Sequence, residues 1–320
     1  MLAGRSSLLD RAFLMRRLLE IPQVYATAIG FPQTDGVSRS EFALLAYVDR
    51  KRPLASLSPL HRLPRTWRGS NGASIPIDVV EMDGPSAAMS LLPGGNPEYA
   101  RRVRPMHPGY SFGLANRAGT LGLIVWPEAG PPRPLILSSS HVLNLRPNGH
   151  IYPLYQPAGF DGGPHDKPVA RALRYTRLHA RIPNHTEAGL AEPLRPEDVS
   201  PRHPLGAINA VCSGLKLGQR LRKVGRTTGL VTGKVVALDW TGWIRFGRQR
   251  YPFANQVLIF NESCPISLDG DSGSVWLSET CEAAAMNFAG CRSGSGSIST
   301  PLSTIFRRLS VRLAMSAEEA

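Results

Sequence analysis

The sequence predicts a mainly β fold preceded by a small α/β N-terminal domain. After about residue 105 the chain holds many short apolar runs separated by Gly and Pro, a spacing typical of β-barrels or a sandwich. Before that point a helical apolar pattern is followed by longer strand-like runs. Apolar residues make up 42% of the 320 positions, which is enough to build a core in each part.

The N-terminal domain is predicted over residues 1–83. Residues 7–10 match a capping box, and a helix ending near Pro22 is expected, with an apolar stripe of Leu8, Ala12, Met15 and Leu19. Strands are expected at 24–31, 41–48 and 75–82, with a short helical or irregular piece at 58–67. Because no phosphate loop, metal cluster or nucleophile occurs there, we expect a packing or recognition module on which a partner protein could dock.

A linker and a β domain follow. Residues 84–104 are rich in Pro and Gly and carry a basic patch at 101–104, so they are predicted to be a linker. The second domain spans 105–320, with strands expected at 120–126, 135–137, 219–224, 234–238, 256–260, 274–277 and 283–288. A terminal helix is predicted from the helical spacing of Thr304, Ile305, Leu309 and Leu313.

Charge and cysteine content narrow the class of protein. The net charge is +13, but 32 of the 37 basic residues are Arg and they are scattered, so nucleic-acid binding is not expected. No apolar run approaches the roughly 18 residues of a membrane span, and residues 1–20 are too charged for a secretion signal. We therefore expect a cytoplasmic protein without a membrane segment.

The four cysteines lack the paired spacing of zinc sites, so neither a metal nor another cofactor is expected. They are predicted to be free thiols, although Cys281 and Cys291 could flank a hairpin and be bridged if the chain were exported.

The segment Gly270-Asp271-Ser272-Gly273-Ser274 fits an exposed nucleophile turn. Its glycines would allow a tight turn in which the amides of Gly270 and Ser272 point at one oxygen and form an oxyanion hole. In isolation, the tetrapeptide Gly-Asp-Ser-Gly within this segment also fits a plain Gly/Ser loop. Partner residues are therefore needed to choose between the two interpretations.

A base and an acid for Ser272 can be found upstream. Among eight histidines, His141 stands out because it follows the strand-like residues 134–137 through three serines. Glu187 precedes a small apolar strand and could orient the imidazole, with Asp161 and Asp166 as reserve acids and a plain surface Glu as the alternative. The order His, acid, Ser differs from the orders found in α/β-hydrolases and subtilisins.

These blocks resemble the catalytic blocks of the chymotrypsin/trypsin-like serine peptidases, over about residues 105 to 312. More narrowly, Gly119-Thr120-Leu121-Gly122, Gln156-Pro157 with Asp161-Gly162-Gly163, and the run 224–229 (VGRTTG) resemble the non-secreted bacterial trypsin-like proteins related to plant narrow-leaf proteins. The resemblance implies a two-barrel Greek-key domain, and a serine endopeptidase with His141, Glu187 and Ser272 as its triad. The family's orienting acid is usually Asp, so Glu187 is a departure.

The resemblance also implies a primary pocket formed by Ile266, Phe288, Ala289 and Gly290. Because no acid lies among them, we expect cleavage of a protein or peptide substrate after an apolar or small residue. Two other functions stay open. A catalytically silent trypsin fold could serve in binding, and a basic nucleic-acid-binding protein is the third alternative.

Overall fold

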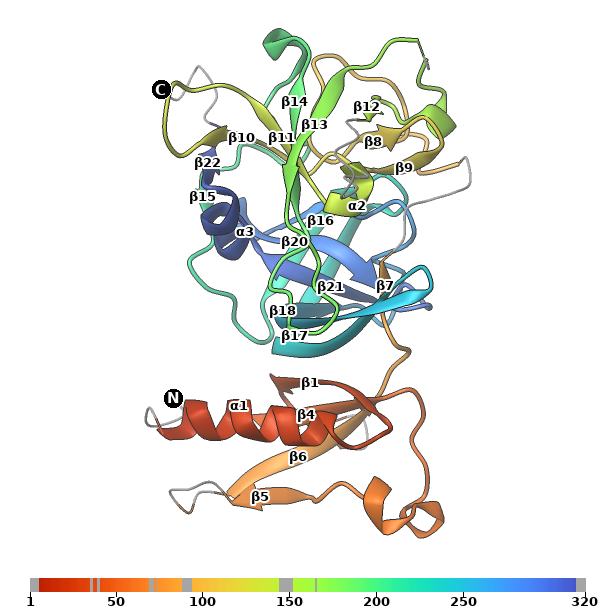
Figure 1. Ribbon diagram of the computed structural model, residues 1–320, viewed down its shortest axis with the longest axis vertical. Coiled ribbons are helices and arrows are strands. Elements are labelled where there is room, and N and C mark those ends of the chain that lie inside the picture. Colours follow the sequence, from red (N-terminus) through yellow and green to blue (C-terminus); the bar gives the residue numbers. More distant parts are fainter. Residues whose placement is uncertain are drawn as a thin grey trace.

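The computed structural model describes residues 6–34, 37–38, 41–68, 72, 74–87, 94–143, 152–164 and 166–314 (Figure 1). It describes no side chains for residues 6–11, where the expected capping box lies, nor for 33, 34, 37 and 38. The fold is mainly β with a small N-terminal helix and strand region, which confirms the predicted fold class. No helix in the described ranges is long and apolar enough to cross a membrane.

The N-terminal unit is one helix on a sheet of four strands, shown in red and orange in Figure 1. The sheet order is β1-β4-β6-β5, and a small hairpin, β2-β3, lies beside it. The bounds are α1 Ser6–Leu19, β1 Val24–Gly30, β2 Gln33–Thr34, β3 Val37–Ser38, β4 Ala43–Val48, β5 Thr66–Arg68 and β6 Ser74–Glu81, with single 3-10 turns at Leu54–Ser56 and Pro59–His61. The three expected strands therefore correspond to β1, β4 and β6.

The buried face of α1 differs from the predicted stripe. Leu14, Met15 and Leu18 are buried against Leu44 of β4, whereas Ala12 is exposed. Leucines, which bury more apolar area than alanine, determine which face of the helix turns toward the sheet.

The first β unit contains a six-stranded sheet in the order β12-β13-β14-β11-β10-β22 and a separate hairpin, β8-β9. Its elements are β8 Ser111–Leu114, β9 Arg117–Thr120, β10 Leu123–Pro127, β11 Leu135–Ser138, α2 Ser140–Leu143, β12 Pro153–Leu154, β13 Ala170–Tyr175, β14 Gly189–Pro193 and β22 Val311–Leu313, with 3-10 turns at Gly159–Asp161 and Pro196–Asp198. The single strand expected at 120–126 is thus the end of β9, a break at Leu121-Gly122, and most of β10.

The second β unit is a closed barrel. Its strands follow the order β16-β19-β20-β21-β18-β17, and pairing of β16 with β17 closes the ring. The bounds are β15 Ala210–Val211, β16 Arg220–Gly225, β17 Gly229–Phe246, β18 Gln249–Phe260, β19 Val275–Leu277, β20 Glu282–Gly290, β21 Gly296–Pro301 and α3 Leu302–Leu309. Residues 237–242 of β17 pair with β1, so the sheet of the N-terminal unit continues that of the barrel.

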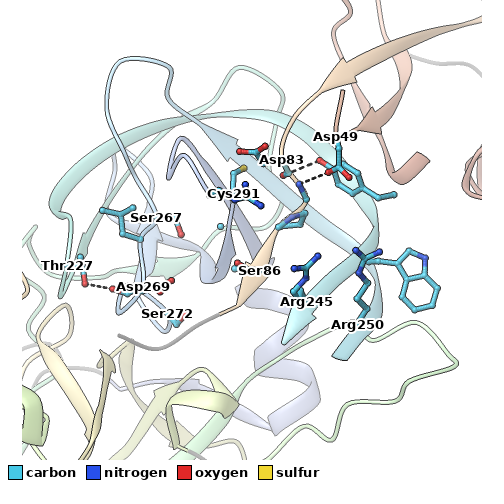
Figure 2. Close-up of a pocket in the computed structure, with 18 residues that line it drawn as sticks. Asp49, Asp83, Ser86, Thr227, Arg245, Arg250, Ser267, Asp269, Ser272 and Cys291 are labelled. Atoms are coloured by element: carbon cyan, nitrogen blue, oxygen red, sulfur yellow. Dashed lines mark hydrogen bonds between the residues drawn. The ribbon is translucent and has the colours of Figure 1, made fainter. Parts of the chain in front are cut away.

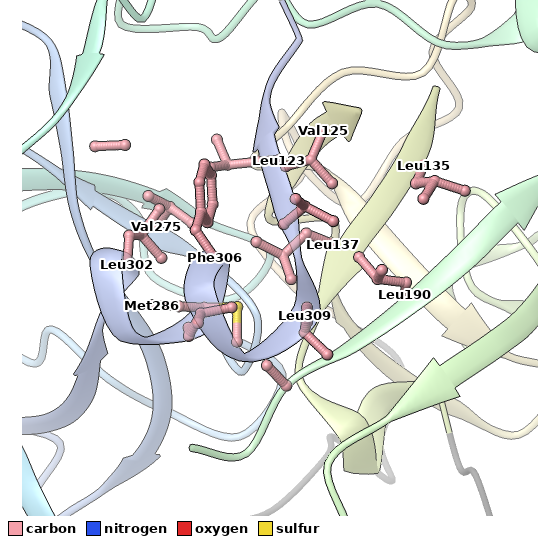
Figure 3. Packing of buried hydrophobic residues seen from close by; sticks show 14 of the residues in the cluster. Leu123, Val125, Leu135, Leu137, Leu190, Val275, Met286, Leu302, Phe306 and Leu309 are labelled. Carbon is pink, nitrogen blue, oxygen red and sulfur yellow. The ribbon is translucent and has the colours of Figure 1, made fainter. Parts of the chain in front are cut away.

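The two β units pack through one apolar cluster, shown in Figure 3. Leu123 and Leu137 come from the first unit, Met286 from the second, and Leu302 and Phe306 from α3. The terminal helix is therefore present as expected, but it stops before Leu313. Ser310 adopts a left-handed conformation (φ 47°) that ends the helix, and Leu313 lies in β22 paired with β10.

The two-residue strand β7, Ser86–Ala87, lies within the predicted linker and joins the large sheet. Ser86 pairs with Gly290 of β20, and Ser86 and Ala87 pair with Arg245 and Phe246 of β17. This segment is therefore held between two strands of the second β unit. The domain boundaries themselves stay a prediction.

Candidate active site

Ser272 lies in a tight turn just before β19. The flanking glycines have φ values of 100° for Gly270 and 96° for Gly273, which L side chains rarely adopt. A Cβ on Gly270 would lie 2.5 Å from Thr227 Oγ1, and one on Gly273 would collide with the carbonyl oxygen of Thr120. Both positions therefore require glycine, and the turn is a constrained structure rather than a plain loop.

The buried Asp271 carboxylate anchors this turn. Its Oδ1 accepts hydrogen bonds from the amides of Thr227 (2.9 Å) and Thr228 (3.0 Å), and its Oδ2 accepts one from the Leu268 amide (3.0 Å). The ammonium of Lys223 lies 3.5 Å from Oδ2, and both side chains are fully buried. Burial lowers the pKa of Lys223, an effect that attraction to Asp271 opposes. A buried ion pair with these additional hydrogen bonds fixes the backbone of the Ser272 turn.

The backbone amides of the turn differ in whether they donate a hydrogen bond within the protein. Those of Asp271, Gly273 and Ser274 donate to the carbonyls of Leu268, Asn287 and Asp271 at 2.8–3.0 Å. The Gly270 amide has no hydrogen-bond partner in the described part of the chain. It is therefore available to a ligand, as an oxyanion-hole donor must be.

His141 is positioned by α2, which begins right after β11. The Glu187 carboxylate, which is 1% exposed, contacts His141 twice. Its Oε1 accepts a hydrogen bond from the His141 amide at 2.8 Å, and its Oε2 lies 3.0 Å from Nδ1 of the ring. A carboxylate only accepts, so Nδ1 carries the proton and Nε2 is left with its lone pair. Such a tautomer is the one that a general base requires.

The alternative acids have other surroundings. Asp161 forms a buried ion pair with Arg226 and accepts a hydrogen bond from Ser111 at 2.6 Å. Asp166 is exposed. Within the described residues, Glu187 is the acid in contact with the imidazole of His141, and its carboxylate contacts both the amide and the ring.

Several contacts bring the histidine side and the serine side together across the two β units. The Thr120 amide donates to the Ser272 carbonyl at 2.9 Å, and the Thr120 hydroxyl donates to the Gly270 carbonyl at 2.9 Å. The His141 ring packs edge-on against Phe246 at 5.8 Å between centroids. Burial raises the pKa of Asp269, next to the serine turn, while the nearby His141 opposes the rise.

The Ser272 hydroxyl and His141 Nε2 are not hydrogen-bonded to each other in this conformation. The Ser272 hydroxyl lies 3.4 Å from the Phe288 carbonyl oxygen, to which it donates. His141 Nε2 is buried and has no hydrogen-bond partner among the described residues. A small rotation of the serine side chain is therefore needed before proton transfer to Nε2.

A cavity of about 820 Å³ opens beside Ser272 (Figure 2). Of the expected pocket residues, Ala289 and Gly290 line it, together with Ser267 and Asp269. Ile266 and Phe288 are fully buried in two different apolar clusters and do not belong to its lining. A Cβ on Gly290 would lie 2.8 Å from Ser267 Oγ, so Gly290 packs directly against Ser267 and a side chain at position 290 would collide with it.

Sequence reasoning missed Lys223 and Thr120 as parts of the site. Lys223 directly precedes the run 224–229 that carries the family resemblance, and it is one of only five lysines in an arginine-rich chain. Its strand β16 (RLRKVG) also carries Arg220 and Arg222, so no local signal distinguished Lys223. Pairing of Lys223 with Asp271, 48 positions later, depends on the barrel closure of β16.

In the described ranges, no group of three His, Cys, Asp or Glu side chains could hold a metal ion. All four cysteines are free thiols, so Cys281 and Cys291 are not bridged. Cys291 lines the cavity, and burial raises its pKa to about 11, so this thiol stays protonated at neutral pH.

Comparisons with known proteins gave structural similarity alone. No protein-family model and no curated protein matches the chain. Among solved structures, it is similar to a glutamic-acid-specific serine protease described as using a histidine triad in substrate binding, at 15% identity over 65% of this chain and 100% of that one (TM-score 0.49). Thermobifida fusca protease A is also similar, at 15% identity over 66% of this chain and 100% of that one (TM-score 0.47). So is Cellulomonas bogoriensis chymotrypsin, at 13% identity over 66% of this chain and 100% of that one (TM-score 0.47). The narrower resemblance to narrow-leaf proteins stays a prediction.

Proposed function

We propose that this protein is a serine endopeptidase of the chymotrypsin type, with His141, Glu187 and Ser272 as its triad. The observation that carries the proposal is the double contact of Glu187 with His141. It fixes the imidazole with Nε2 as the basic nitrogen, close to the glycine-flanked serine turn. A Gly/Ser loop without a catalytic role would not need a histidine held in this orientation.

The reaction follows from these roles. Nε2 of His141 takes the proton of the Ser272 hydroxyl as Oγ attacks the carbonyl carbon of a peptide bond. The carbonyl oxygen becomes an oxyanion held by the amides of Gly270 and Ser272. When the tetrahedral intermediate collapses, the C–N bond breaks and His141 gives its proton to the leaving amine. Water then repeats the sequence on the acyl-enzyme and releases the acid.

We propose cleavage after a small or apolar residue, since Ala289 and Gly290 line the cavity beside Ser272. We propose a cytoplasmic location for this activity, since four free thiols suit a reducing compartment. A peptide-library profile dominated by Arg or Lys would contradict the proposed specificity.

The test is labelling of the purified full chain with a fluorophosphonate probe. Ser272→Ala and His141→Ala should abolish labelling, whereas the exposed-residue controls Ser303→Ala and His179→Ala should label like the wild type. Glu187→Gln should reduce the rate by up to about 10⁴-fold, since the imidazole loses its orienting carboxylate. Labelling that persists in Ser272→Ala would refute the mechanism.

A catalytically silent binding protein is the second candidate. The contact compatible with it is the hydrogen bond that the Ser272 hydroxyl donates to the Phe288 carbonyl at 3.4 Å. In that case the probe would label neither the wild type nor any variant, while the Ser272→Ala protein would bind its partner as well as the wild type does.

A further inference from the structure

The strand β7 lies at the edge of the candidate active site. Pro85 and Ser86 line the same cavity as Ser272 and Gly290, and Figure 2 shows the strand passing through the opening beside Ser272. Ser86 pairs antiparallel with Gly290 on one side and parallel with Arg245 on the other, and the Arg245 amide donates to the Pro85 carbonyl at 3.2 Å. A two-residue strand paired on both sides is a bound segment rather than a passing loop.

The position of β7 is the one that an extended peptide would need. Extended peptides bind proteins by adding a strand to a free sheet edge, where main-chain hydrogen bonds supply the affinity. Here the edge next to the nucleophile is the end of β20, where the Phe288 carbonyl accepts from Ser272 and Gly290 lines the cavity. Because β7 already pairs with Gly290, another peptide cannot pair there at the same time.

The direction of β7 also matches a substrate. Since β7 runs antiparallel to β20, its chain proceeds from Gly290 toward Phe288 and therefore toward Ser272. Its side chains are small: Pro85 and Ala87 are buried, and Ala87 belongs to the apolar cluster that contains Phe288 and Ala289.

The N-terminal unit holds β7 in place. β1 pairs with β17, for example Ala26 with Gly242. The segment leading into β7 is tied to the same unit, because Tyr25 donates to the Met82 carbonyl at 2.7 Å and the Gly84 amide donates to Asp49 at 3.1 Å. A tethered strand of this kind has an effective concentration of about millimolar or more at its site. A free peptide at micromolar concentration would compete poorly with it.

We propose that β7 is an intramolecular occupant of the peptide-binding edge, so that the N-terminal unit inhibits the site until β7 is released. This inference rests on the proposed peptidase function. The occupant is the chain's own Pro85–Ala87 segment, and the surface that binds it consists of Gly290 on β20 and Arg245-Phe246 on β17.

The experiment uses the full chain and displaces β7 by substitution. Ala87→Glu puts a charge where a buried alanine packs, which should expel the strand. Ala129→Glu makes the same exchange at an exposed loop position and is the matched control. We expect fluorophosphonate labelling of Ala87→Glu to be faster than that of the wild type by roughly tenfold or more, with Ala129→Glu unchanged.

Two further measurements keep the test decisive. Ser86→Pro removes a backbone donor from the same strand without introducing a charge, and it should also speed up labelling. Added synthetic peptide Asp83–Ala87 at millimolar concentration should slow the labelling of Ala87→Glu again. Hydrogen exchange at the Gly290 amide reports whether β7 has left, independently of activity.

The outcomes separate the two proposals. Equal labelling of the wild type and both β7 variants, with faster exchange at Gly290 in the variants, would overturn the inhibition and leave the peptidase standing. Absence of labelling in every protein would refute the peptidase. Hydrogen exchange at the Gly290 amide would then test whether β7 occupies the edge. Slow exchange in the wild type that becomes fast in Ala87→Glu would support β7 as the bound strand. Fast exchange already in the wild type would overturn β7 as the occupant.

Discussion

The ion pair beneath the serine turn can be tested by replacing Lys223 with methionine. Methionine keeps much of the buried apolar volume next to Trp276, whose ring lies 5.5 Å from the Lys223 ammonium, but it removes the charge. Asp271 is then left as a buried carboxylate without a counterion. Loss of one partner of a buried ion pair typically costs about 3–5 kcal/mol.

The size of the effect follows from the remaining contacts of Asp271. The amides of Thr227, Thr228 and Leu268 still donate to the carboxylate and stabilise its charge. We therefore expect a loss of about 3 kcal/mol in the free energy of unfolding, at the lower end of that range. Because Asp271 also anchors the Ser272 turn, fluorophosphonate labelling should fall by about tenfold, less than the loss of a whole oxyanion donor.

The assay is equilibrium unfolding in urea, followed by tryptophan fluorescence, together with the labelling rate. Lys216→Met, at an exposed lysine, is the matched control and should change the unfolding free energy by less than about 0.5 kcal/mol. If Lys223→Met were as stable as this control and labelled at the wild-type rate, the ion pair would not support the turn.

Three further predictions concern stability and positioning. Burial lowers the pKa of His203 to about 3. Below pH 6.5 the unfolded state therefore binds more protons than the folded state, and His203 costs about 1.4 kcal/mol of stability per pH unit down to pH 3. In acid titrations, His203→Gln should lose less stability than the wild type by that amount per pH unit. A slope equal to the wild type's would contradict this. Gly273→Ala should lose about 1–3 kcal/mol in urea unfolding because of its positive φ and the collision with Thr120, whereas Gly214→Ala, with no atom within 4 Å of the added Cβ, should be nearly neutral; equal losses would refute the strain. Glu187→Asp should label more slowly than the wild type, because a shorter acid cannot reach both the amide and the ring; an unchanged rate would show that one contact suffices.

The sequence by itself determined the class of fold and pointed to the serine turn and to His141. Period-two and helical patterns identified β1, β4, β6 and most barrel strands, because these patterns record which side chains are buried. The glycines around Ser272 were readable for a similar reason, since a positive φ restricts the residue type locally. His141 was found from its place after a strand, which is also a local feature.

Tertiary structure decided what depends on distant partners. Which acid faces His141 could not be derived from spacing, because Glu187, Asp161 and Asp166 all follow it and only the folded sheets show that Asp161 pairs with Arg226 instead. The same holds for Lys223 beneath Ser272, which barrel closure brings to Asp271.

The role of residues 84–87 also depended on tertiary structure. Their Pro and Gly content predicts a linker, since such residues favour irregular backbone. The pairing of Ser86 with Gly290 depends on main-chain groups, which are the same for every residue type and leave no trace in the sequence.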